Sequence, residues 1–211
     1  MENRWEGKQG SWPNRFYATL KNSLLHPTAF FSEIAKGDNF ASPILYALVN
    51  SAILIFVSAL FSYAVKFHLL PTVGMKLTSP SVASGFFAGP GALAIAIFII
   101  PFVVVGYFIT AALFHMGLYI VGGVKQSFIA TFRVVCYSTG AQLFAIIPFL
   151  GGIVAGIWML VLHMIGLKIV HETDFLRAAF AVLLPVLLCC GILIFLFTGI
   201  LAGGLLAALI G

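Results

Sequence analysis

Residues 131–140 read TFRVVCYSTG and place one cation, Arg133, inside a long apolar stretch. Around it, 62% of the chain is hydrophobic, only 8% is charged, and the mean hydropathy is +1.13. Soluble domains are about half apolar and about one quarter charged. The composition therefore predicts an integral membrane protein, in which a buried arginine needs an explanation.

Five apolar runs are long enough to cross a bilayer, for which about 18 residues are needed. They predict an all-α protein with five transmembrane helices at residues 43–65, 92–121, 128–149, 151–170 and 178–210. As one straight helix the last run would measure about 50 Å, against a hydrocarbon core of about 30 Å. It must therefore tilt, extend beyond the membrane or break, with Pro185 and Gly191 as the natural breaking points.

The positions of the basic residues predict the orientation, because lysine and arginine gather near helix ends on the cytoplasmic side. With a cytoplasmic N-terminus, that side holds Arg4, Lys8, Arg15, Lys21, Lys36, Lys125, Arg133, Lys168 and Arg177. The outer side then holds only Lys66 and Lys76, both in the long connection of residues 66–91. We therefore expect the N-terminus inside, the C-terminus outside, and no role in nucleic-acid binding for the net positive charge.

The chain divides into a cytoplasmic arm of residues 1–42 and a membrane domain of residues 43–211. Residues 1–12 are polar and contain glycine, so we expect them to be disordered. After them, Phe16, Tyr17, Leu20 and Leu24 share one helical face, which predicts an amphipathic helix in the headgroup plane. A second short helix is expected from Pro27. The arm is either a partner-binding platform or a plain anchor for the first span.

Four polar side chains lie at similar depth in the predicted spans: His115, Arg133, Tyr137 and His163. They form either a polar cluster or separate packing residues. Ionisable groups in a membrane are costly, so Arg133 needs an anion. Its candidate partners are Glu172 and Asp174 in the loop HETDFLR, which also contains Arg177, and such a pair would lock the third span to that loop. Lipid phosphates are the other candidate anion.

Several classes of function lack their residues. No Asp or Glu occurs between Asp38 and Glu172, whereas ion-coupled transporters use buried carboxylates. Two histidines without a thiolate or carboxylate make an incomplete metal site. No hydrolase, metalloprotease or phosphate-loop motif is present. We therefore expect a protein that is not an enzyme, with no metal or cofactor.

Small residues recur at the spacing Gly152-x-x-x-Gly156. This spacing permits close contact between helices in lipid. It favours packing within the chain over a dimer face.

Residues 115–185 resemble the YIP family, five-span membrane proteins named for interacting with Ypt/Rab GTPases. The similar segments are TFRVVCYSTG, IPFLGGIVAGIW at 147–158 and HETDFLRAAFAVLLP at 171–185. Upstream, LLHPTAFFSEIAKGDNFASPILYAL at 24–48 resembles the prokaryotic branch of that family. The resemblance implies the same five-span topology that the charges predict.

Eukaryotic members of the family act in vesicle budding and Golgi traffic, bind prenylated Rab proteins and assemble with one another. This chain lacks their long arm and its Asp-Leu-Tyr-Gly-Pro segment, so Rab binding is not transferred. The resemblance points to a bacterial or archaeal member in the plasma membrane and implies its architecture more than its mechanism. The function that we expect is a non-enzymatic scaffold or adaptor that organises protein partners or lipids. Its expected partners are membrane lipids and other membrane proteins or further copies of the chain. A small-solute channel or transporter that uses the histidine–arginine–tyrosine cluster is the alternative.

Overall fold

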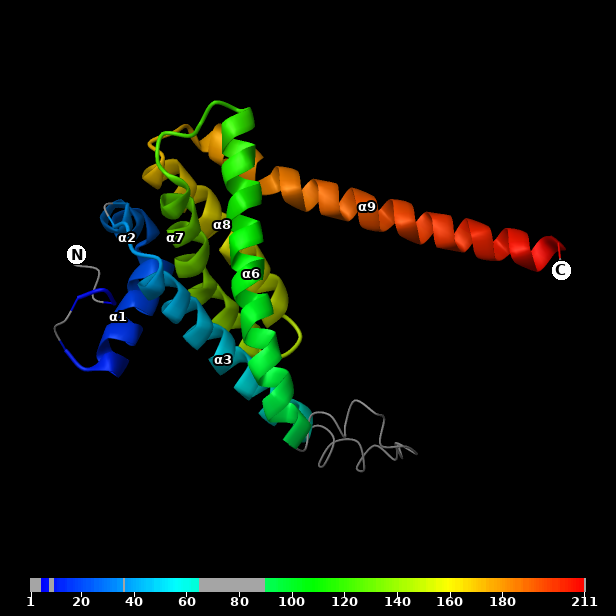
Figure 1. Cartoon of the computed structure of the whole chain (residues 1–211), viewed down its shortest axis with the longest axis horizontal. Coiled ribbons are helices and arrows are strands. Elements are labelled where there is room, and N and C mark those ends of the chain that lie inside the picture. The colour runs from blue at the N-terminus through cyan, green and yellow to red at the C-terminus, as the bar shows by residue number, and fades with distance from the viewer. Residues whose placement is uncertain (1–4, 8–9, 36, 65–89, 211) are drawn as a thin grey trace.

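The structure is a computed structural model that describes the backbone of residues 5–7, 10–35, 37–64 and 90–210, and the side chains of residues 5–7, 10–35, 37–61 and 100–199. The expected long connection at residues 66–91 lies almost entirely outside these ranges. The described elements are all helical (Figure 1): α1 Trp12–Leu25, α2 Pro27–Ile34, α3 Ala41–Ala64, α6 Pro90–Ile120, α7 Phe128–Ser138, the 3₁₀ helix η2 Thr139–Ile146, α8 Gly151–Val170 and α9 Phe175–Ile210.

Five helical segments of the described chain are long and apolar enough to cross a membrane, which confirms the predicted class. Four of them follow the expected bounds closely, and α8 matches its expected range. The third segment, α7 with η2, lies at the centre: 67% of its apolar window is buried, against 11–33% for the other four. The apolar runs therefore predict the spans, while the burial singles out the segment that contains Arg133.

The third span differs from the single helix expected over residues 128–149. Its α-helix ends at Ser138, and a 3₁₀ helix continues to Ile146. The Ser138 hydroxyl donates to the Val134 carbonyl and the Thr139 hydroxyl to the Cys136 carbonyl. Hydroxyls that bond the preceding turn weaken the regular α-helical ladder, and 3₁₀ turns are common where an α-helix ends.

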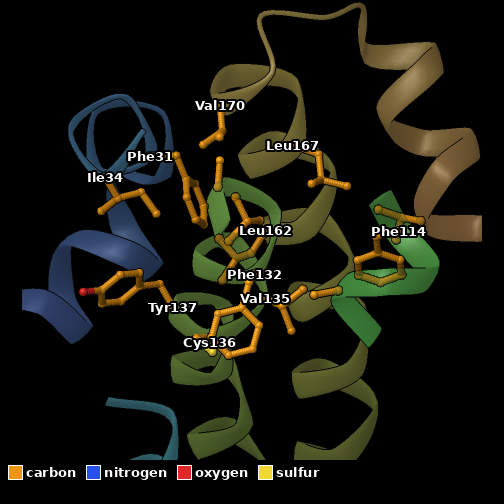
Figure 2. Packing of buried hydrophobic residues seen from close by; sticks show 14 of the residues in the cluster. Phe31, Ile34, Phe114, Phe132, Val135, Cys136, Tyr137, Leu162, Leu167 and Val170 are labelled. Atoms are coloured by element: carbon orange, nitrogen blue, oxygen red, sulfur yellow. The ribbon is translucent and has the colours of Figure 1, made fainter. Parts of the chain in front are cut away.

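The second helix of the arm, α2, packs into the bundle. Phe30, Phe31 and Ile34 are between 0% and 2% exposed. Figure 2 shows Phe31 and Ile34 in the same cluster as Tyr137, Leu162 and Val170 of the membrane helices. Hydrophobic burial therefore ties this helix to the spans, and the arm and the membrane domain share one core.

The first helix, α1, only partly follows the predicted amphipathic face. Phe16 and Leu24 pack against the core, whereas Tyr17 is 65% exposed. Thr19 and Ser23 are buried on the packed side. Whether this helix lies in the headgroup plane stays a prediction.

The last helix, α9, crosses α6 closely and then leaves the bundle. A Cβ atom at Gly117 would lie 2.8 Å from the Ala181 Cα atom, so the crossing requires glycine. The helix contains Pro185 but is continuous to Ile210. Its C-terminal half runs away from the other helices in Figure 1, and Ile192, Ile194 and Phe195 are more than half exposed.

Candidate functional site

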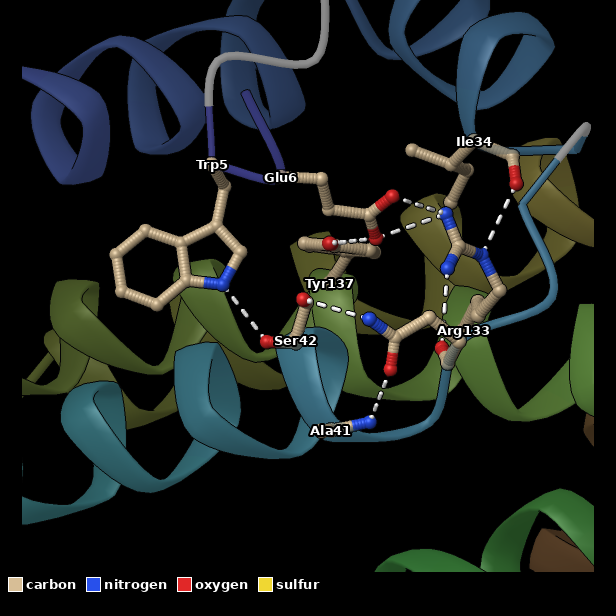
Figure 3. A network of polar contacts seen from close by, with 8 residues as sticks. Trp5, Glu6, Ile34, Ala41, Ser42, Arg133 and Tyr137 are labelled. Atoms are coloured by element: carbon tan, nitrogen blue, oxygen red, sulfur yellow. Dashed lines mark hydrogen bonds and ion pairs between the residues drawn. The ribbon is translucent and has the colours of Figure 1, made fainter. Parts of the chain in front are cut away.

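The candidate site is the surroundings of Arg133, which is 1% exposed on α7 (Figure 3). Its Nε donates to the Ile34 carbonyl at 3.0 Å, and its Nη1 donates to the Asn39 carbonyl at 3.1 Å. Its Nη2 lies 3.0 Å and 2.9 Å from the two carboxylate oxygens of Glu6. Because Ile34 is the last residue of α2, the guanidinium also caps the negative end of that helix.

The predicted pairing of Arg133 with Glu172 or Asp174 is wrong, because the anion comes from Glu6. Asp174, which directly precedes α9, instead pairs with Arg177 of that helix at 3.7 Å, with both side chains exposed. The Glu172 side chain is exposed as well. Arg133 faces α2 and the link from α2 to α3, which hold its other two acceptors, so its charged end opens toward the N-terminal segment.

Trp5 anchors the segment that carries Glu6. Its indole Nε1 donates to the Ser42 carbonyl at 2.7 Å, and the side chain is only 5% exposed. Its ring lies edge-on to Trp12, Phe16 and Tyr46, with centroids 5.6–6.2 Å apart. The expectation of disorder over residues 1–12 is therefore wrong for Trp5 and Glu6. The buried tryptophan ring supplies enough apolar contact area to order this segment, although most of the neighbouring residues in the sequence are polar.

Tyr137 belongs to the same site. Its hydroxyl donates to the Glu6 carboxylate at 2.6 Å, and its ring lies 5.9 Å from the Arg133 Cζ atom. The one-turn spacing from Arg133 places both side chains on one face, as expected. Glu6 thus receives a charge-assisted hydrogen bond from each, and such bonds are stronger than bonds between neutral groups.

His115 joins a second network instead. The His171 Nδ1 accepts from the backbone N–H groups of Lys125 and Gln126 at 3.3 Å and 3.2 Å, so in the neutral ring the proton sits on Nε2. That Nε2 donates to the Thr131 hydroxyl at 2.8 Å, and Thr131 donates to the His115 Nδ1 at 2.9 Å. Burial, with a smaller effect of nearby His115, lowers the pKa of His171 to about 4. The neutral ring joins the loop after α6 to the loop after α8.

His163 lies apart from both networks. It is 5% exposed on α8, and its ring lies edge-on to Phe114 at 5.0 Å. The four polar residues therefore do not gather into one cluster: Tyr137 joins Arg133, His115 joins His171, and His163 packs in the core. Within the described residues, no three metal-ligating side chains lie close enough to hold an ion.

Gly152 and Gly156 do not make the close helix contact that their spacing predicts within the chain. A Cβ atom at either position would meet no atom within 4 Å. Both line an open groove of about 580 Å³ between α3, α6, η2 and α8. Its polar residues include Ser51 and Tyr107, whose hydroxyls are 2.7 Å apart.

The family model described as Yip1 domain matches residues 21–208, which is most of the chain and includes α2, α7 and Arg133. No curated protein and no solved structure matches the chain. Trp5 and Glu6 lie outside the matched range.

Proposed function

Because the chain belongs to the Yip1 domain family, we propose that this multi-pass membrane protein is a non-enzymatic scaffold or adaptor that organises protein partners or lipids. An ionisable residue inside a membrane marks a functional site by default. Here three protein groups bind the guanidinium, namely the backbone carbonyls of Ile34 and Asn39 and the Glu6 carboxylate. Its role is to hold the arm on the membrane helices in one arrangement, which is what a binding platform needs.

The observation that carries this proposal is the ion pair between Glu6 and Arg133, because it joins residues 127 positions apart. Removing one partner of a fully buried ion pair costs about 3–5 kcal/mol, and the 24% exposure of Glu6 lowers the expected cost here to about 2–3 kcal/mol. In the free protein this pair holds the arm against the spans, so a partner meets a preformed arrangement of α1 and α2. Preformed surfaces bind with a smaller loss of conformational entropy.

The proposed working surface combines the arm with two loops. The Lys125 Nζ donates to the Glu172 carbonyl at 2.6 Å, and the Arg177 Nη1 donates to the Gly122 carbonyl at 3.1 Å. Beside these bonds, Phe175 and Leu176 are 48% and 80% exposed. Positive charge next to exposed apolar side chains suits a contact with acidic proteins or with anionic lipid.

A small-solute pathway has less support. The residues predicted to line it divide among three separate surroundings, and three of them, Arg133, Tyr137 and His163, are buried. The cytoplasmic orientation of the arm, and a bacterial or archaeal plasma membrane as its location, remain proposals that rest on the charge distribution and the resemblance.

Native mass spectrometry of the gently solubilised full chain tests the function. A co-released protein or a discrete oligomer supports the adaptor. A monomer that carries only a metal or a small solute contradicts it and favours transport. The variant Arg133→Gln is the matched comparison, because loss of the guanidinium also releases α2 and its link to α3 and should weaken whatever assembly the wild type retains.

A further inference from the structure

The groups around Arg133 form a binding site for a carboxylate, and the side chain of Glu6 occupies it. Two of its donors, Nε and Nη1, are used by the backbone carbonyls of Ile34 and Asn39. These bonds fix the guanidinium plane and leave Nη2 directed at Glu6, beside the Tyr137 hydroxyl (Figure 3). The acceptor groups that orient Arg133 therefore come from α2 and its link to α3, not from the segment that carries Glu6.

Gly37 allows the link to close over the guanidinium. A Cβ atom at this position would overlap the Arg133 side chain and lie only 2.7 Å from its Nη1 atom. No larger residue fits without displacing the charged group. The link from α2 to α3 therefore covers one side of the guanidinium, and the Glu6 carboxylate lies at the edge that the link leaves uncovered.

A second pocket, for an aromatic ring, adjoins this carboxylate site. Trp5 fits between α1 and the start of α3, where Phe16 and Tyr46 contact its ring and the Ser42 carbonyl accepts its N–H. Two consecutive residues thus fill two specific pockets. Tryptophan, tyrosine and arginine are the residues that most often dominate binding energy at protein interfaces.

The segment of residues 5–7, which carries Trp5 and Glu6, is held mainly by its side chains and is not part of a helix. Residues 5–7 form a turn, and among the described residues it is held by the contacts of Trp5 and Glu6 and by a bond from the Arg15 Nη1 to the Gly7 carbonyl at 2.6 Å. Glu6 is 24% exposed, whereas Arg133 is 1% exposed. The carboxylate therefore lies on the solvent side of the pair, where another carboxylate can replace it.

From this geometry we propose that the Arg133–Tyr137 pocket and the adjoining Trp5 pocket form a peptide-binding site for a partner segment in which an aromatic residue directly precedes a carboxylate. Trp5–Glu6 is its resident occupant and is exchanged when the partner binds. The inference rests on the adaptor function and names the class of partner. A lipid headgroup would satisfy only the cationic half, because it offers no aromatic ring to Phe16 and Tyr46.

Competition by the resident segment has a predictable size. The apparent dissociation constant of an external peptide rises by the inverse of the fraction of molecules whose site is open. If the segment is docked in about 99% of molecules, the peptide binds wild type about 100-fold more weakly than an open site. The ratio of the two constants therefore measures docking.

The test uses the full chain in nanodiscs of zwitterionic lipid, with a fluorescent synthetic peptide of residues 3–9, NRWEGKQ, as the probe. The variant Trp5→Ala/Glu6→Ala empties the site. Asp38→Asn, which removes an exposed carboxylate of the same arm, is the matched control. We expect fluorescence anisotropy to show binding to the emptied variant, at least tenfold weaker binding to wild type and Asp38→Asn, and a loss of binding when the peptide carries Gln in place of its Glu.

Equal affinity for wild type and the emptied variant would overturn the proposal, and so would the absence of binding to a folded emptied variant. If that variant does not fold, Glu6→Gln keeps Trp5 and tests the same prediction, with tighter peptide binding than wild type expected. An emptied variant that ignores the peptide and retains anionic lipid in its mass spectrum would assign Arg133 to lipid. If wild type co-releases a protein partner but the peptide fails to bind, the peptide site is refuted while the adaptor function stands.

Discussion

Glu6→Ala is the sharpest perturbation of the structure, because it removes a single side chain near the N-terminus and leaves Arg133 buried in the bundle. The guanidinium loses its ion pair with Glu6, and the Tyr137 hydroxyl loses its hydrogen bond to the same carboxylate. Removing one member of a buried ion pair costs about 3–5 kcal/mol. Water can reach the vacated position, since Glu6 is 24% exposed, and this lowers the expected loss to about 2–3 kcal/mol.

A loss of that size should lower the melting temperature by about 5–10 °C for a chain of this length. Cys136 provides the assay, because its thiol is buried one turn from Arg133 and becomes reactive only on unfolding. The exposed thiols are removed first with Cys189→Ala/Cys190→Ala. A maleimide dye that fluoresces on reaction then reports thermal unfolding of the region around α7.

The comparison variants separate this pairing from the one that the sequence suggested. Asp174→Asn and Asp38→Asn each remove an exposed carboxylate and should change stability by less than about 0.5 kcal/mol. An unchanged melting temperature for Glu6→Ala would refute the reasoning. A large loss for Asp174→Asn would restore the expected pairing with the loop after α8.

Three further predictions follow from other contacts. Gly117→Ala should sharply reduce the yield of folded protein, because its methyl group meets the α9 backbone at Ala181, whereas Gly156→Ala faces open space and should be tolerated, which size-exclusion profiles will show. Tyr137→Phe should lower stability by about 1 kcal/mol through the lost bond to Glu6, measured by the same thiol assay. Lowering the pH from 6.5 toward 4 should destabilise the protein, because the pKa of His171 is about 4 in the folded chain and higher in the unfolded chain, which therefore binds the proton more readily. His171→Gln should flatten the dependence of the melting temperature on pH over this range.

Local patterns account for most of the fold. An apolar run longer than the bilayer becomes a helix because its backbone polar groups can be satisfied only within the segment. This rule depends on composition and length alone, so it predicted all five spans and located α8 to the residue. The helical repeat likewise predicted that Arg133 and Tyr137 are neighbours, because one turn of helix separates them.

The partners of those residues required the tertiary structure. Glu172 and Asp174 are closer to Arg133 in the sequence than Glu6 is. However, α2 packs against α7 and α8, and this packing directs the guanidinium toward Glu6, in a segment whose polar composition suggested disorder. The glycine spacing was equally ambiguous: Gly152 and Gly156 fit a contact motif yet face open space, while Gly117, outside that motif, makes the close crossing. Helix formation depends on each segment's own composition, whereas ion pairs and crossings depend on which segments meet, and that is decided by burial of the whole chain.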